Sequence, residues 1–164
     1  MTDESTTDPR GKVTELIRDA GVCMFTTTSL DGRLVSRPMA LQEAEFDGEL
    51  WFFAYADSAK VRQLRVNPEV NLSFSDQKRQ SWVSVSGTAR EGFDRAKAEQ
   101  LWSPLLKAWF PDGVDTAGLT LVTVHATSAE YWDYPSGRVV SLLGIARVLV
   151  TGKPPGGDNR QVDY

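Results

Sequence analysis

Two Asp-Gly pairs, Asp31-Gly32 and Asp47-Gly48, each lie between short runs rich in β-branched and aromatic residues. Asp-Gly readily adopts the positive φ angles of a tight turn, so this arrangement indicates β-hairpins. The first pair joins a predicted strand over residues 22–28 to one over 33–45, and the second joins that strand to one over 50–55. These three strands predict an antiparallel meander.

Further strands extend the predicted sheet. Apolar and polar residues alternate over 70–75 and again over 83–89, as they do in strands that have one face in water. Residues 119–126 and 130–133 are predicted as two final strands. Six or seven antiparallel strands with peripheral helices predict a mainly β fold, a small closed or split β-barrel, because closure removes exposed sheet edges.

Helix signals lie outside these strands. Asp8 as N-cap, Pro9 at the first helical position and Gly21 as a stop signal define a first amphipathic helix. Apolar residues recur at helical spacing over 94–110, which predicts a helical region there. Residues 139–150 are predicted as an apolar helix, although the end of this segment would also suit a strand.

The 164 residues, 41% of them hydrophobic, suit one domain with a core. We expect a flexible N-terminus over residues 1–11, one domain over 12–152, and a C-terminal tail over 153–164 that is flexible or lies across a partner. Without an apolar run of about 18 residues or a secretory signal, the sequence favours a cytoplasmic protein with no membrane contact. The net charge of −4 argues against a nucleic-acid partner.

The chain contains one cysteine, Cys23, and one histidine, His125. These are too few for a histidine and cysteine metal site, so no metal is expected. Cys23 has apolar neighbours and is predicted to be a buried strand thiol. His125 has no partners for nucleophilic catalysis near it in sequence, so we assign it no role. Glycine-rich nucleotide-binding loops are absent from the sequence as well.

A phosphate site is suggested by Ser58 and Lys60, which lie at the start of a short predicted helix capped by Asp57 or Ser58. Helix starts leave backbone N–H groups unpaired and carry the positive end of the helix dipole. These amides, the Ser58 hydroxyl and the Lys60 ammonium could therefore converge on one dianion. On its own, however, this pattern is more often an ordinary N-cap with a solvated lysine.

A set of segments along the chain adds specificity. They are DGR at 31–33, SRPM at 36–39, FDGELWFF at 46–53, DSAK at 57–60, VSVSGTA at 83–89, LWSPLLKAWFP at 101–111, EYWD at 130–133 and TGKPP at 151–155. Together they resemble the FMN-binding split-barrel family related to pyridoxamine 5′-phosphate oxidase, and within it the general stress protein 26 type. The resemblance covers nearly the whole chain and implies a six- to seven-stranded antiparallel split barrel.

The resemblance also implies FMN at a homodimer interface, with its phosphate held by Ser58 and Lys60. Gln80 or Ser81 would reach the flavin from the other subunit, and Trp132 would close over it, although Trp132 is equally consistent with a core role. The residues implied in cofactor binding are Arg37, Pro38, Met39, Phe53, Ala54, Tyr55, Ser58, Lys60, Gln80, Ser81 and Trp132.

The sequence gives separate support for the homodimer. Trp102, Trp109 and Phe110 are large apolar side chains beyond what one thin sheet and its short helices are expected to cover. A barrel of this size also has little concave surface of its own for a flavin. We therefore expect an obligate homodimer with two equivalent sites.

The chain departs from the family pattern after its EYWD segment. The authentic oxidase carries an Arg-x-His element there, whereas this chain has Arg138-Val139-Val140, so pyridoxamine phosphate oxidation is not expected. We predict an FMN-dependent oxidoreductase with a stress-related role, an unknown small-molecule substrate and unidentified catalytic residues. Two alternatives remain open: a non-catalytic flavin-binding stress or sensor protein, and a split barrel that uses FAD, deazaflavin F420 or haem.

Overall fold

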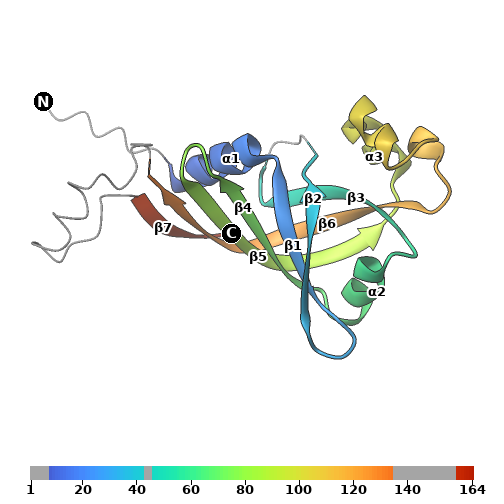
Figure 1. Cartoon of the computed structure of the whole chain (residues 1–164), viewed down its shortest axis with the longest axis horizontal. Coiled ribbons are helices and arrows are strands. Elements are labelled where there is room, and N and C mark those ends of the chain that lie inside the picture. Colours follow the sequence, from blue (N-terminus) through green and yellow to red (C-terminus); the bar gives the residue numbers. More distant parts are fainter. Residues whose placement is uncertain (1–7, 43–45, 135–157) are drawn as a thin grey trace, which may run out of the picture.

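The computed structural model describes residues 8–42, 46–134 and 158–164 (Figure 1). Within these ranges, three α-helices and two short 3₁₀ helices surround seven strands. The helices are α1 Pro9–Ala20, α2 Ala59–Val66, α3 Arg95–Leu101, η1 Pro104–Ala108 and η2 Gly113–Asp115. The strands are β1 Val22–Thr28, β2 Leu34–Ala40, β3 Glu49–Tyr55, β4 Glu69–Asp76, β5 Ser81–Gly92, β6 Leu119–Asp133 and β7 Asp158–Asp163.

The seven strands form one antiparallel sheet in the order β2-β1-β4-β5-β6-β3, with β7 also beside β6. The sheet curls until the chain after β2 meets β3, where the Gln42 amide donates to the Trp51 carbonyl at 3.2 Å. Among the described residues this is the one backbone bond across what we call the β2–β3 seam. A curled sheet with an open seam confirms the predicted split barrel.

The predicted meander of β1, β2 and β3 is wrong at its third strand. β3 pairs along its whole length with β6, from Glu49 opposite His125 to Tyr55 opposite Leu119. The reason is burial: β2 is mostly exposed, whereas β3 carries apolar side chains on both faces. Phe52 lies in the main core and Phe53 in a second core. Pairing with the equally buried first half of β6 keeps both faces covered.

The two predicted final strands are one strand, β6, with 15 residues. Its register with β5 shifts between Ser86 and Gly87, which face Ser128 and Ala126, so a bulge at Thr127 absorbs the irregularity. A Cβ atom on Gly87 would lie 2.2 Å from the His125 carbonyl oxygen. Only glycine permits the two strands to approach this closely.

Two hydrophobic cores hold the sheet and helices together. The main core lies between the sheet and helices α1 and α2, and the second joins α3 and η1 to β3 and β6. The predicted cap of α1 is confirmed, since the Asp8 carboxylate accepts from the amides of Arg10 and Gly11. Gly21 ends this helix with a φ of 67°, also as predicted. Cys23 is buried as predicted, and burial raises the pKa of its thiol to about 12.

The chain ends differ from the predicted flexible segments. Helix α1 already begins at Pro9, and residues 158–163 form β7, which covers the edge of β6 beyond the end of β3. Without β7 that half of β6 would expose unpaired backbone groups. Val162 is 8% exposed, and the Tyr131 hydroxyl donates to the Asp158 carboxylate at 2.7 Å.

The predicted helix over residues 139–150 lies outside the described residues. Within the described ranges, no helix has the length and apolar composition needed to cross a membrane.

Candidate functional site

Arg37 and Lys60 lie close together where β2 passes the start of α2. The Arg37 guanidinium, half-buried on β2, donates through Nη2 to Gln63 Oε1 of α2 at 3.2 Å. Lys60 lies one helical turn before Gln63 on the same helix. Burial lowers the pKa of Lys60, and the nearby charge of Arg37 lowers it further. The structure therefore brings Lys60, a predicted phosphate ligand, close to Arg37, a predicted cofactor-binding residue.

Ser58, one of the two predicted caps, is the N-cap residue of α2, but its side chain makes no capping hydrogen bond. Its Oγ atom is buried and has no hydrogen-bond partner in the described part of the chain. An unpaired buried hydroxyl costs about 1–3 kcal/mol, so such groups in native proteins usually have a partner. A ligand oxygen at the start of α2 would supply one.

The basic side chains of the site also indicate an anionic ligand. Burial lowers the pKa values of Arg37 and Lys60, and for Lys60 the Arg37 charge adds to the effect. Within the described ranges neither side chain forms a salt bridge. Two neighbouring cations without a carboxylate favour an anion between them.

The β2–β3 seam leaves backbone groups of β3 open. Phe53 and Ala54 bury their side chains in the second and main cores, and the Tyr55 hydroxyl donates to the Trp109 carbonyl at 2.7 Å. The side chains of these three residues are therefore occupied. The family resemblance implies these residues in cofactor binding, and with their side chains occupied they would contact a flavin through backbone groups at the open strand edge.

Pro38 and Met39 follow Arg37 on β2 and point to opposite faces of the sheet. Met39 is 8% exposed and belongs to the main core, whereas Pro38 is exposed. Met39 therefore contributes packing behind the site, and Pro38 contributes outer surface.

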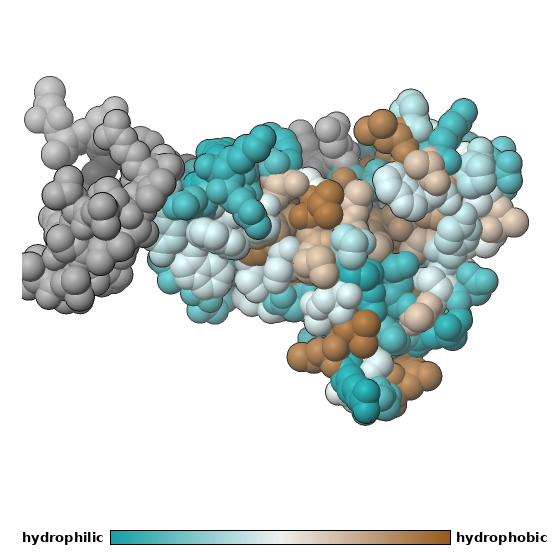
Figure 2. Space-filling view, viewed as in Figure 1, coloured by the Kyte–Doolittle hydropathy of each residue, from teal (hydrophilic) through white to brown (hydrophobic). Residues whose placement is uncertain are grey.

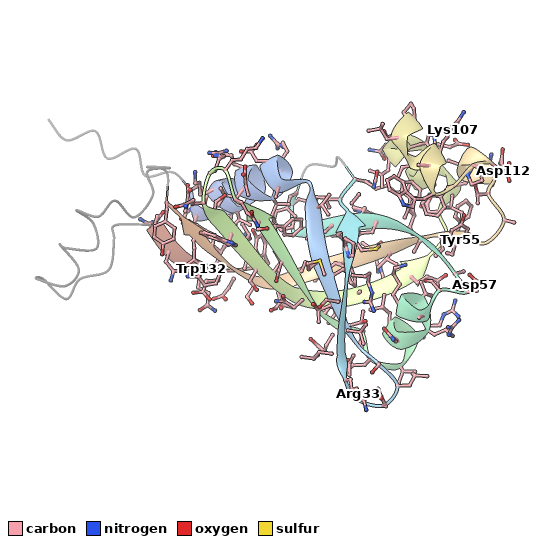
Figure 3. The ribbon with its side chains drawn as sticks, viewed as in Figure 1. Arg33, Tyr55, Asp57, Lys107, Asp112 and Trp132 are labelled. Carbon is pink, nitrogen blue, oxygen red and sulfur yellow. The ribbon has the colours of Figure 1, made fainter. Side chains whose placement is uncertain are left out.

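The remaining predicted residues lie at the opposite end of the sheet. Figure 3 places Trp132 near β7 and Asp57 beside α2, at opposite ends of the molecule. Ser81 is 3% exposed, so its side chain is buried in its own chain, whereas Gln80 is half-exposed in a turn with a φ of 51°. One chain thus does not bring Gln80, Ser81 or Trp132 near Ser58.

A groove of about 500 Å³ runs over the outer face of the sheet at this second end. Trp82 of β5 lies directly across the strands from Trp132 of β6, and both line the groove. Val22 and Met24 of β1 are 51% and 45% exposed on the same face, and Trp82 is 41% exposed. Here we call these four residues the apolar sheet face.

The predicted surplus of large side chains is only partly borne out. Phe110 is 6% exposed and packs in the second core, and Trp102 packs edge-on against Phe53 with ring centres 5.5 Å apart. Trp109 remains 63% exposed. Figure 2 shows further hydrophobic surface at the tip of the β1–β2 hairpin, where Leu34 is 78% exposed.

Two residues of the site around Arg37 and Lys60 were not predicted from the sequence. Thr27 of β1 and Gln63 of α2 both contact Arg37, but each is a neutral residue without a recognisable motif. The available signal for Gln63 was its spacing, three residues after Lys60 and so on the same face of the helix. For Thr27 the sequence holds no such signal.

Comparisons with known proteins relate the chain as a whole to a family. The family described as "Pyridoxamine 5'-phosphate oxidase like" matches residues 8–156. Protein bli-3 of Neurospora crassa is 34% identical over 140 residues, which cover 80% of this chain and 67% of that protein.

Solved structures show the same fold. A general stress FMN/FAD binding protein from Xanthomonas citri is 28% identical, with a TM-score of 0.68 over 80% of this chain and 92% of that one. A Clostridium acetobutylicum protein related to general stress protein 26 is 19% identical and superposes with a TM-score of 0.69 over 93% and 92% of the two chains. The latter supports the fold alone.

Proposed function

Because this chain belongs to the pyridoxamine 5′-phosphate oxidase-like family, we propose that it binds FMN with the phosphate between Arg37 and Lys60. The observation that carries the proposal is the buried, unpartnered Ser58 Oγ at the start of α2, two residues before Lys60. Lys60 and its neighbour Arg37 have no carboxylate partner in the described chain. A phosphate dianion would accept hydrogen bonds from all three side chains and from the first amides of α2. The residues present therefore fit the group.

The flavin ring would follow the β2–β3 seam away from the phosphate. Arg37 lies on one side of this seam, and the open backbone edge of β3 lies on the other. The Xanthomonas citri relative, which is an FMN/FAD binding protein, supports a flavin over haem. That relative's name covers both FMN and FAD, so the choice of FMN over FAD is part of our proposal.

We further propose that the bound flavin, which supplies hydride and electron transfer, makes the protein an oxidoreductase for a small molecule. The chain's own residues would bind and orient the cofactor. A second candidate is a flavin-binding stress protein without turnover, favoured by the Xanthomonas citri relative, whose name refers to general stress.

One preparation tests both proposals. The absorption spectrum of freshly purified protein, together with the cofactor released from it, should identify FMN. A released deazaflavin, haem or FAD would contradict the cofactor proposal. Bound flavin should then be reduced and its reoxidation followed with candidate small molecules. Reoxidation well above the rate with oxygen supports turnover, whereas no acceleration supports the stress-protein alternative.

A homodimer would complete the site. Trp132 lies at the opposite end of the molecule from Asp57, the residue before Ser58 (Figure 3). Gln80 directly precedes Ser81, which pairs with Asp133 at the Trp132 end of the sheet. Gln80 and Trp132 would therefore reach the same flavin only from a second copy. The apolar sheet face offers a surface for that copy, since no helix of the described chain covers it. Its exposed tryptophan and methionine side chains are typical of protein interfaces.

Dilution tests this assembly. If two chains share each site, FMN affinity should fall when the protein is diluted into its monomer range, because a monomer holds only half of the ligands. Sedimentation measured beside the FMN titration identifies that range. A monomer that retains stoichiometric FMN would contradict the shared site.

A further inference from the structure

The Arg37 guanidinium is held by three neutral acceptors. Its Nη1 atom donates to the Phe25 carbonyl at 3.2 Å and to Thr27 Oγ1 at 2.6 Å, and its Nη2 atom donates to Gln63 Oε1 at 3.2 Å. The Thr27 hydroxyl in turn donates to the same Gln63 oxygen at 2.6 Å. Thr27 is 1% exposed, so this network is anchored in the interior. The arginine therefore has a defined orientation before any ligand arrives.

The neutrality of these partners matters for anion binding. Arginine side chains in proteins are often oriented by carboxylates, which hold the guanidinium but cancel its charge. Here a backbone carbonyl, a hydroxyl and an amide provide the orientation, and the charge of Arg37 remains available next to Lys60. Gln63 is central because its oxygen accepts from both Arg37 and Thr27.

Gln63 also links the two halves of the site. It belongs to α2, the helix that begins after Ser58 and carries Lys60, whereas Arg37 belongs to β2. Its hydrogen bond to Arg37 therefore fixes the distance between the guanidinium and the start of the helix. A displaced guanidinium would lose the geometry needed for a phosphate held by both elements.

We propose that Gln63 is a positioning residue that fixes Arg37 for phosphate recognition and, as a neutral amide, keeps the site cationic. This inference rests on the proposed FMN function. It assigns to Gln63 no contact with a reacting atom. Its effect should appear in affinity for the phosphate group and not in affinity for the flavin ring.

The test compares FMN with riboflavin, which lacks the phosphate, in variants of Gln63. Gln63→Glu can still accept from Arg37 but adds a negative charge, so FMN affinity should fall at least tenfold while riboflavin affinity stays within twofold of native. Gln63→Met, of similar size but without the acceptor, should reduce FMN affinity severalfold through a misplaced Arg37. Thermal unfolding of each variant measures whether the fold survives.

Two controls separate positioning from general damage. Gln100→Glu makes the same chemical change at an exposed position of α3 and should leave both affinities at native values. In an Arg37→Ala background, Gln63→Met should cause no further loss of FMN affinity, because its effect acts through the arginine.

The outcomes separate this inference from the proposed function. A native protein that prefers FMN strongly, with a preference unchanged in both Gln63 variants, would overturn the inference alone. Equal weakening of FMN and riboflavin would also overturn it, since that result indicates a structural role. A native protein that binds both flavins equally, or neither, would contradict the proposed phosphate site itself.

Discussion

Two clusters of basic side chains in this protein differ in what surrounds them. In the first, Lys12 Nζ lies 2.8 Å from the Asp133 carboxylate and 3.6 Å from that of Glu15, which also pairs with Arg79 at 3.0 Å. The hydrogen bond to Asp133 raises the pKa of Lys12, and the one from Arg79 lowers the pKa of Glu15. Each charge in this cluster has an opposite charge beside it.

In the second cluster, Arg37 donates to neutral acceptors, and within the described ranges neither Arg37 nor Lys60 forms a salt bridge. Their pKa values move down, because burial disfavours the charged form and no carboxylate in the described chain offsets it. The first cluster ties α1 to the sheet and is complete. The second would be completed by an added anion. A basic cluster therefore indicates a binding site when its members are partly buried and unpaired, not merely when they are numerous.

The largest expected effect is on cofactor binding by Lys60→Ala. Loss of one charge-assisted contact should weaken FMN binding by roughly 1.5–3 kcal/mol, about ten- to a hundredfold in affinity. The fold should survive, because Lys60 forms no salt bridge in the described chain. Calorimetric titration measures the affinity, with the exposed Lys107→Ala as a matched control. Unchanged FMN affinity in folded Lys60→Ala protein would remove Lys60 from the site.

A substitution in the first cluster should change stability and leave FMN affinity unchanged. Lys12→Met leaves the Asp133 carboxylate, 5% exposed, without its cation, and should lower the free energy of unfolding by about 1–2 kcal/mol. FMN affinity should remain native. Urea unfolding tests the first statement, and adding Asp133→Asn to Lys12→Met should recover part of the loss. An FMN defect in Lys12→Met would erase the distinction between the two clusters.

Ser58→Ala sharpens the comparison at a single hydroxyl. An N-cap serine usually contributes about 1 kcal/mol to stability, but the buried Ser58 hydroxyl makes no capping bond, so its removal should leave the apo protein at least as stable as before. FMN affinity should fall by about 0.5–1.5 kcal/mol, the net value of one hydrogen bond.

Asp94 provides the matched control for Ser58, because its carboxylate accepts from the Lys97 amide at 3.0 Å and caps α3. Asp94→Ala should lose about 1 kcal/mol of stability and no FMN affinity. If Ser58→Ala behaves like Asp94→Ala, the Ser58 hydroxyl is structural and not a ligand.

The smallest expected effect is on the pH dependence of binding. The pKa of Lys60 is lowered from 10.5, so between that lowered value and 10.5 the unfolded chain holds a proton that the folded apo protein has released. The stability contributed by this group therefore rises with pH in that window. FMN affinity should fall over the same range, because the phosphate prefers the charged lysine.

Lys60→Arg keeps its charge throughout this range and removes that part of the pH dependence. FMN affinity should be measured for native and Lys60→Arg protein from pH 7 upward. Any ionisation of the flavin itself affects both proteins equally and cancels in the comparison. Identical pH profiles for the two proteins would show that Lys60 does not titrate in contact with the ligand.

Local features of the fold followed from the sequence. The cap at Asp8, the stop at Gly21 and the turn at Asp31-Gly32 depend on residues within a few positions of each other. Strand pairing between β3 and β6 did not follow, because it joins segments about seventy residues apart. Alternation within each strand shows which face is buried but not which strand lies beside it.

In the candidate site, too, the residues close together in sequence were predicted, whereas contacts between distant segments were not. Ser58 and Lys60 belong to one short segment, and the family resemblance added Arg37 from a distant strand. Thr27 and Gln63 were missed because they act on Arg37 and would touch no phosphate themselves. The tail that forms β7 was missed because its polar sequence, with Val162 as its one buried residue, carries no strand pattern.

The central claim is that Arg37 and Lys60, the cations of the second cluster, bind the phosphate group of the cofactor. Titration of the native protein with FMN and with riboflavin, in one buffer and at one protein concentration, tests it most directly. The account predicts that FMN binds at least tenfold more tightly, a difference of about 1.4 kcal/mol or more. Equal affinity for the two flavins would contradict it.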